Sequence, residues 1–495
     1  MLFGIGLLYK VIDIMSKRIE LIKSIALILL ILLSIVLFAN SWVREWSYSD
    51  SENDTLLRRL VSSVGFGDFF GYASQPPSGT DIIAPSTVIL TSGTKRVILN
   101  KGTEGYADNY SDILSVLLCA ENPDGAVKSV SAEEWFSAQK TQAIYLNYGM
   151  NIKRQVLETT LGCSLPSELG SISSIVLTSN SSATNKLVIY FRDGVADSFY
   201  KLLTRDSARS VEDILSRNKG YSNTPLAVEL GFNSSPEEGI SQQIVIDGNA
   251  VINLEGGYVP QVTLIPVENA SDLLDNRSLN SLLALFGMSK SSASRYADSD
   301  GTSTYIDTYG SLSFHNIEDF PVIEYTAAAS SKGKELNNTK TDIMYNMAYN
   351  SYTQVYSVAE LFGINGVSFK IASDITTASI SSQGETTIYI DYCANGIPLY
   401  LNSGEEVGHA AELRFNSSGE LIYYKQNLFD VQQTDARINI PPVLDAINSL
   451  DPTDKIFGNV LYIKDIFGSY SIKDGEARFL WSIRIDGDDK IYSAE

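Results

Sequence analysis

The stretch from Ile25 to Val43 reads IALILLILLSIVLFANSWV and contains no charged residue. A helix rises about 1.5 Å per residue and needs about 20 apolar residues to cross the hydrocarbon core of a bilayer, so this stretch is long enough for one span. Basic residues keep their end of a span in the cytoplasm, and three of them come just before it: Lys17, Arg18 and Lys23. The sequence therefore predicts a single-pass protein of the cell membrane with a cytoplasmic N-terminus and an extracellular body.

This stretch is either a retained anchor or a cleaved signal peptide, and its C-terminal end bears on the choice. Residues 39–41 (Ala-Asn-Ser) supply small side chains in the pattern of a cleavage site, which keeps the second interpretation open. The apolar run is longer than the core of a usual signal peptide, and this favours an anchor. Trp42 and Trp46 stand where the run meets water, as interfacial aromatic residues do.

One face of the anchor is expected to contact another membrane helix. Ser34 is the polar residue deep in the run, and it shares a stripe at helical spacing with Ile31, Phe38 and Ser41. Membrane helices meet through small or polar side chains because these allow close approach. The alternative is that Ser34 bonds back to the carbonyl one turn earlier.

The start of the chain offers two methionines. Residues 1–14 are apolar but interrupted by Lys10 and Asp13, and they are too short to span a membrane. The lead MSKRIELIKSIALILL from Met15 is more basic, so we expect translation to start there.

Composition limits the classes of function. The chain has 495 residues, a formal net charge of −21 and 44% hydrophobic residues, which is enough for several packed domains. A nucleic-acid-binding surface needs a basic face, so the acidic balance argues against nucleic acid as a partner. The three cysteines lie far apart, at Cys119, Cys163 and Cys393, and this odd count predicts buried thiols. A single disulfide is the alternative.

The body is expected to have an α+β fold with antiparallel hairpins and helices on one face. Residues 85–99 (PSTVILTSGTKRVIL) read as two strands around a Ser-Gly turn, and Ser131 opens a helix with a capping box. Four parts are predicted: the N-terminal segment and anchor (1–46), a first extracellular domain (47–148), a central domain (149–328) and a C-terminal domain (329–495).

The last two domains are expected to share one antiparallel-sheet-plus-helix plan. Gly194 matches Gly396 at the turn of one strand pair, and Gly248 matches Gly419 at the turn of a second pair. A helical stretch and two further strands follow in each copy. Because order and spacing hold over four elements, we interpret the pattern as an internal repeat.

No motif with catalytic or metal-binding spacing is present in the sequence. The two histidines, His315 in a strand and His409 in a turn between strands, stand apart from any metal or nucleophile motif, so we expect them to be satisfied or solvated. No catalytic, cofactor-binding or metal-binding residue is therefore predicted. Carboxylates are abundant, which keeps a glycosidase-type pair open.

Three features resemble the YycH family, exported regulators of an essential sensor histidine kinase that controls the cell wall in Gram-positive bacteria. Residues 23–42 (KSIALILLILLSIVLFANSW) are similar to that family's lead and anchor, and PSTVIL and SAEEWF stand at similar positions. Residues 282–314 resemble its central signature, with Leu-Phe followed by Arg295, Asp300-Gly301, Tyr305 and Asp307. The C-terminal domain also resembles the partner family YycI, and its end, LWSIRIDGDDKIY, looks similar to PepSY domains.

The resemblance implies a regulator that is not an enzyme and needs no cofactor. Its membrane helix would pack against the helices of the sensor histidine kinase, together with a YycI-like partner protein, and its outer domains would sense or scaffold. The residues alone leave a second class open, an anchored envelope hydrolase that acts on peptidoglycan or polysaccharide. A converged carboxylate pair or a buried ionisable cluster in a deep cleft would favour the hydrolase.

Overall fold

The computed structural model describes most of the chain after residue 77. The described ranges are 78–118, 123–179, 185–232, 243–252, 256–267, 276–298, 302–317, 320–328, 342–376, 380–381, 384–403, 406–449, 460–473, 476–485 and 491–494. The predicted anchor (25–43), Trp46 and Met15 all lie outside these ranges. Among the helices within them, none combines the length and the apolar character that a membrane span requires.

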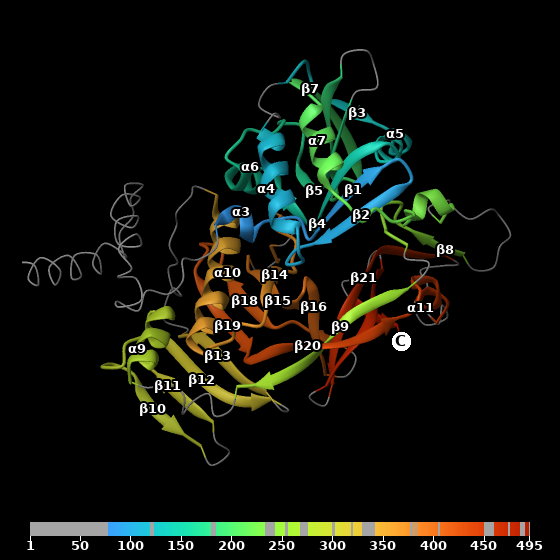
Figure 1. The fold of residues 1–495 in the computed structure, drawn as a ribbon. Helices are drawn as coiled ribbons and strands as arrows, with labels where there is room; N and C mark the ends of the chain where they lie inside the picture. The colour runs from blue at the N-terminus through green and yellow to red at the C-terminus, as the bar shows by residue number, and fades with distance from the viewer. Residues whose placement is uncertain are drawn as a thin grey trace, which may run out of the picture. The chain divides into compact units, whose positions relative to one another are not determined.

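A seven-stranded antiparallel sheet forms the first part of the body, in the order β2-β1-β4-β5-β6-β7-β3 (Figure 1). Its strands are β1 (Thr87–Ser92), β2 (Lys95–Asn100), β3 (Lys128–Val130), β4 (Gln142–Lys153), β5 (Ser171–Ser179), β6 (Lys186–Asp193) and β7 (Ser198–Ser207). The helices of this part are α3 (Gly79–Ile82), α4 (Tyr106–Leu117), α5 (Ala132–Ala138), α6 (Arg154–Leu161) and α7 (Arg209–Arg217).

Alternating side chains of this sheet fill two cores. Val88 and Leu90 of β1 belong to the core that also contains the buried residues of α4 and α7. Ile89, between them, faces the opposite side and packs in the cluster built around Trp135 of α5, which is fully buried. The period of two along a strand explains this division, because successive side chains point to opposite faces.

A sixteen-stranded mixed sheet forms the second part, with the main order β10-β11-β12-β13-β19-β18-β15-β16-β21-β22-β9-β20. Strands β14, β17, β23 and β8 pair with β15, β16, β22 and β21. The strands are β8 (Gln243–Ile246), β9 (Gly257–Pro266), β10 (Ser294–Ala297), β11 (Ser303–Ile306), β12 (Gly310–Ile317), β13 (Phe320–Ala327), β14 (Ser368–Ile371), β15 (Thr386–Ala394), β16 (Ile397–Ser403), β17 (Glu406–Gly408), β18 (Ala411–Phe415), β19 (Leu421–Asn427), β20 (Phe429–Ile440), β21 (Val460–Lys473), β22 (Glu476–Ile485) and β23 (Ile491–Ala494).

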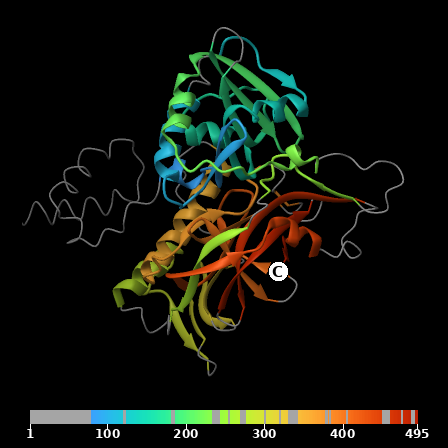
Figure 2. The ribbon, with the colours of Figure 1, turned by 45° about the vertical axis from the view of Figure 1, so that its right-hand side comes forward.

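Helix α10 (Ile343–Leu361) is the longest described helix and covers one face of this sheet (Figure 2). Asp342 caps its N-terminus by accepting hydrogen bonds from the backbone N–H groups of Met344 and Tyr345. Tyr352 of α10 packs edge-on against Phe369 of β14, which in turn packs edge-on against Tyr392 of β15. Two further α-helices, α9 (Asn276–Leu285) and α11 (Val443–Ser449), and a short 3-10 helix, η2 (Ala227–Leu230), complete this part.

The predicted α+β class is confirmed, and so are two local predictions. Residues 87–100 form the β1–β2 hairpin, with Ser92 paired to Lys95 at the turn. Ser131 caps α5 as predicted, because its hydroxyl accepts from the backbone N–H of Glu134 at 3.2 Å, but the Glu134 carboxylate that would complete the capping box accepts from Lys201. Both features depend only on neighbours in the sequence.

The boundary predicted between residues 148 and 149 falls inside β4. Gly149 has a φ of +70°. It lies between Asn147 and Ile152 of β4, where the pairing of β4 with β5 shifts register. A glycine at such an irregularity bends a strand without ending it. The central segment 149–328 therefore supplies β5 to β7 to the first sheet and β8 to β13 to the second.

The predicted repeat is wrong. Gly194 and Gly396 do lie at hairpins, β6–β7 and β15–β16, and Gly419 turns β18 into β19. Strand β8, before Gly248, instead pairs in parallel with β21, more than 200 residues later. The apolar pattern shows that a strand forms but not which strand it pairs with, and the Gly194 and Gly396 hairpins lie in different sheets.

Candidate functional site

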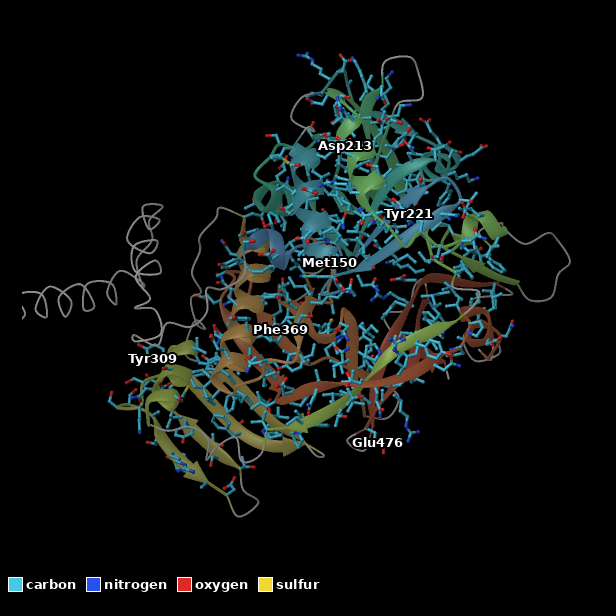
Figure 3. All side chains as sticks on the ribbon, viewed as in Figure 1. Met150, Asp213, Tyr221, Tyr309, Phe369 and Glu476 are labelled. Carbon is cyan, nitrogen blue, oxygen red and sulfur yellow. The ribbon has the colours of Figure 1, made fainter. Side chains whose placement is uncertain are left out.

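The two sheets are joined directly where β4 ends. Ile152 forms a parallel bridge with Ile375, and Asn151 donates to both carboxylate oxygens of Asp374 from its backbone and side-chain nitrogens, each at 2.7 Å. Lys153 then forms an ion pair with the Asp342 carboxylate that caps α10, at 2.8 Å. In Figure 3, Met150 marks the end of β4, and Phe369 marks β14, the strand that precedes Asp374.

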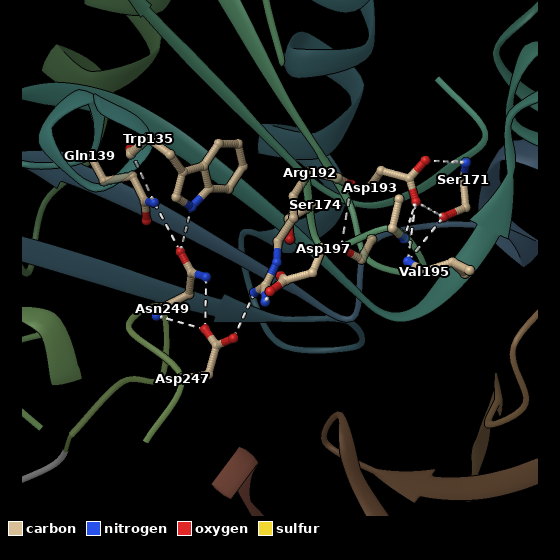
Figure 4. A network of polar contacts seen from close by, with 12 residues as sticks. Trp135, Gln139, Ser171, Ser174, Arg192, Asp193, Val195, Asp197, Asp247 and Asn249 are labelled. Atoms are coloured by element: carbon tan, nitrogen blue, oxygen red, sulfur yellow. Dashed lines mark hydrogen bonds and ion pairs between the residues drawn. The ribbon is translucent and has the colours of Figure 1, made fainter. Parts of the chain in front are cut away.

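A second connection is the polar network shown in Figure 4. The side-chain oxygen of Asn249 accepts hydrogen bonds from Trp135 Nε1 and Gln139 Nε2, both at 2.9 Å. Asp247 accepts from the backbone N–H of Asn249 at 2.9 Å and from Arg192 at 2.7 Å. These groups tie residues 247–249, which follow β8, to the first sheet.

Close packing reinforces this network. A Cβ added to Gly248 would lie 2.4 Å from the ring of Phe136. The backbone N–H of Asp247 also bonds to the carbonyl of Ile463 on β21, at 2.8 Å. Residues 247–249 thus contact both sheets at once.

Half-buried cations gather beside the first connection, in what we call the Gly149 site: Gly149, Lys370, Phe467 and Arg484. Lys370 Nζ lies 5.9 Å from the centre of the Phe467 ring and Arg484 Cζ lies 5.6 Å from it. An Arg484 nitrogen donates to the Gly149 carbonyl at 3.4 Å, and Lys370 Nζ lies 3.6 Å from where a Cβ of Gly149 would be. Strands β4, β14, β21 and β22 contribute these four residues.

A buried carboxylate with its own partners borders the Gly149 site. Asp391, which faces Lys370 across β14 and β15, is 1% exposed and lies 2.6 Å from His409 Nδ1. The Tyr400 hydroxyl also bonds to this carboxylate. The His409 ring stacks on Tyr389, with ring centres 4.5 Å apart. Asp391 is thus already satisfied by neighbouring donors.

Lys101 and Cys393 lie next to this group. Burial lowers the pKa of Lys101 to about 8, and its ammonium donates to the Asp81 carbonyl at 2.5 Å. Burial raises the pKa of the Cys393 thiol to about 12, so it carries no charge at neutral pH. The Cys163 and Cys393 thiols are buried, as predicted, and Cys119 lies outside the described residues.

The Asp391–His409 pair has the geometry that orients a catalytic base, but a nucleophile must lie on the other ring nitrogen. Within the described ranges, no hydroxyl or thiol bonds to His409 Nε2. His315 lies in β12, as predicted, 3.7 Å from Glu324. No three His, Cys, Asp or Glu side chains in the described part group as a metal site would need.

A hollow of about 450 Å³ lies where the β9–β20 ladder slips register between Gln433 and Arg437. Its lining includes a single carboxylate, Asp435. Glycoside hydrolysis by the usual route requires two carboxylates across the substrate. This hollow therefore lacks the feature that would favour the hydrolase interpretation.

Comparison with solved structures finds a match for this arrangement in the crystal structure of YycH from Bacillus subtilis. The TM-score is 0.51 at 12% sequence identity, and the match covers 85% of this chain and 98% of that chain. The chain has a YycH-like fold. No family model matches the sequence, and no curated protein does. Nothing in the likeness to YycH supports the predicted YycI-like character of the C-terminal part.

The predicted partner-contact stripe and both tryptophans lie outside the described residues: Ile31, Ser34, Phe38, Ser41, Trp42 and Trp46. The signature segment lies on the ribbon β10–β12, where Arg295 sits over the Tyr305 ring and Asp307 accepts from the N–H groups of Tyr309 and Gly310. These contacts shape the ribbon. The sequence does not predict the Gly149 site, because its residues are spread over more than 300 positions and form no local motif.

Proposed function

We propose that this protein is a regulator, not an enzyme, of a two-component sensor histidine kinase that controls cell-wall metabolism. The observation that carries the proposal is the YycH-like fold, which extends over 85% of the chain. Fold likeness alone does not transfer a function, so the proposal also draws on the anchor, the lead and the signature segment of the sequence.

The finer parts of the proposal concern the membrane. The protein is anchored by one helix over residues 25–43, with Trp42 and Trp46 at the interface and the body outside the cell. The stripe around Ser34 contacts the kinase's own helices, and a YycI-like protein joins the assembly. Small and polar side chains at helix spacing are what such contacts use.

The connections between the two sheets suit a regulator that passes a force or a displacement to its anchor. Asn151–Asp374, Lys153–Asp342 and Arg192–Asp247 each join residues far apart in the sequence with charged or polar contacts of 2.7 or 2.8 Å. Contacts at several separate points hold the two sheets together. A displacement of one sheet would then move the other.

Deletion of the gene tests the proposal. We expect the transcripts controlled by the kinase to change, and the full-length protein to restore them. Purified protein should at the same time leave isolated peptidoglycan uncut. Unchanged transcripts together with release of wall fragments would contradict the proposal and support the anchored hydrolase.

A further inference from the structure

We propose that the Gly149 site binds an oxyanion, a carboxylate or phosphate group on a small ligand. The inference does not rest on the proposed function. It rests on the convergence of Lys370 and Arg484 on one aromatic ring and one glycine.

Neither cation is neutralised within the described part of the chain. Lys370 donates no hydrogen bond there, and Arg484 donates only the 3.4 Å bond to the Gly149 carbonyl, so most of its five N–H groups lack a protein acceptor. Neither forms an ion pair with a described carboxylate. Other half-buried or buried cations do find a carboxylate within 2.9 Å: Arg96, Lys153, Arg154 and Arg192. Half-buried Lys101 and Lys425 also lack such a pair, but among the described cations only Lys370 and Arg484 approach the same ring.

Carboxylates lie near both cations but form no ion pair with them within the described residues. Asp391 faces Lys370 across the strands, but His409 and Tyr400 already bond to its carboxylate. Asp465 faces Arg484 in the same way, and its carboxylate accepts from the backbone N–H of Ile466. Cys393 stays neutral because burial raises its pKa to about 12. Lys101 adds a third cation nearby, and the repulsion between it and Lys370 contributes to its lowered pKa. Lys370 and Arg484 thus stand near carboxylates without pairing with them, which leaves both cations open to an acidic ligand.

Further groups border the two cations closely. Gly149 has no side chain, and a Cβ there would lie 2.8 Å from Ser86 Oγ and 3.6 Å from Lys370 Nζ. Tyr400 lies edge-on to Phe467, with ring centres 6.5 Å apart, and supplies an aromatic wall. Arginine offers planar paired donors to an oxyanion, and lysine adds a point charge.

Thermal unfolding of the full-length protein in detergent tests the proposal, with inorganic phosphate as the probe and chloride at equal ionic strength as the reference. We expect phosphate to raise the unfolding midpoint of the wild type. K370Q and R484Q should lose this increase. K464Q and R478Q, at exposed positions on the same strands as Phe467 and Arg484, should retain it. An equal increase in all five proteins would overturn the proposal, because it would reflect a general salt effect.

A measurement on the wild type alone covers the case in which the variants fail to fold. Acylation of lysines is followed residue by residue by mass spectrometry. Phosphate at about ten times its dissociation constant should slow the labelling of Lys370 about tenfold and leave Lys464 unchanged. Labelling of Lys370 that does not respond to phosphate or to acetate would refute the site. Protection by acetate as well would show that a carboxylate suffices, and protection by phosphate alone would identify a phosphate ligand.

Discussion

His409 Nδ1 lies 2.6 Å from a carboxylate oxygen of Asp391, and this carboxylate is 1% exposed. The stacking of Tyr389 on the same imidazole and the bond from Tyr400 to the same carboxylate place the pair in an aromatic enclosure. A buried carboxylate is costly unless donors satisfy it, and here both neighbours do so.

The change Asp391→Asn tests how much this pair stabilises the fold. Removal of the charge weakens the hydrogen bonds from His409 and Tyr400, and bonds to charged groups contribute about 1.5–3 kcal/mol. We expect the free energy of unfolding to fall by about that amount in urea titrations. Asp435→Asn, at an exposed position on β20, should change it by less than about 0.5 kcal/mol. Equal effects of the two changes would show that the pair is not a stabilising contact.

Because of Lys101, we expect the stability of the fold to vary with pH in the alkaline range. Its pKa in the folded protein is about 8, below its ordinary 10.5, because burial disfavours the charged ammonium. The unfolded chain therefore binds more protons than the folded one between these values, so stability rises with pH in this window. Relative to Lys101→Met, the wild type should gain about 1–3 kcal/mol from pH 8 to pH 10.5.

The comparison with Lys101→Met cancels the titration of the tyrosines and cysteines, which both proteins share. Urea titrations at several pH values provide the measurement. A difference between the two proteins that stays flat, or falls as the pH rises, would show that the Lys101 ammonium is solvated.

Gly248→Ala should disturb the contact of residues 247–249 with the first sheet. The new Cβ would lie 2.4 Å from the Phe136 ring, and such overpacking costs about 1–3 kcal/mol. Gly257→Ala, where nothing lies within 4 Å of the added Cβ, is the matched control. Phe136→Ala should relieve part of the cost, so that the double variant loses less than the sum of the two single changes. Strict additivity would count against the contact.

Cys163 and Cys393 should react only after unfolding. Burial raises the pKa of Cys393 to about 12, and Cys163 is buried as well. The thiolate is the reactive form, so alkylation of these residues in the native protein should be slow. Thiol counting on unfolded, unreduced protein should give three, and a count of one would reveal a disulfide.

The local elements of the fold follow from the sequence, and the long-range pairings do not. The turn at Ser92–Lys95 and the Ser131 cap each depend on residues within about four positions. Strand β9 pairs with β20 across more than 150 residues, and β8 pairs with β21 across more than 200. An apolar, alternating segment fits many partners equally well, so periodicity cannot select one.

Long-range strand pairing also explains which predictions about the site held and which did not. The sequence predicts a domain boundary at residue 148, whereas strand β4 continues through Gly149, beside Lys370 and Arg484. His409 is expected from the sequence to be satisfied or solvated, and its partner Asp391 lies 18 residues away on β15. Pairing of this kind depends on the sheet register, which no local motif encodes.

The most direct test of regulation through contact is co-purification of the sensor histidine kinase with the full-length protein from membranes. We expect replacement of the stripe residues Ser34 and Ser41 by Leu to reduce the amount of kinase recovered, because a Ser contact between membrane helices contributes about 0.6–2 kcal/mol. Replacement of Leu29 and Leu33 by Ile, on the opposite face, should leave recovery unchanged. Equal recovery with both sets of variants, or full regulation in cells by the body without residues 1–46, would contradict this account.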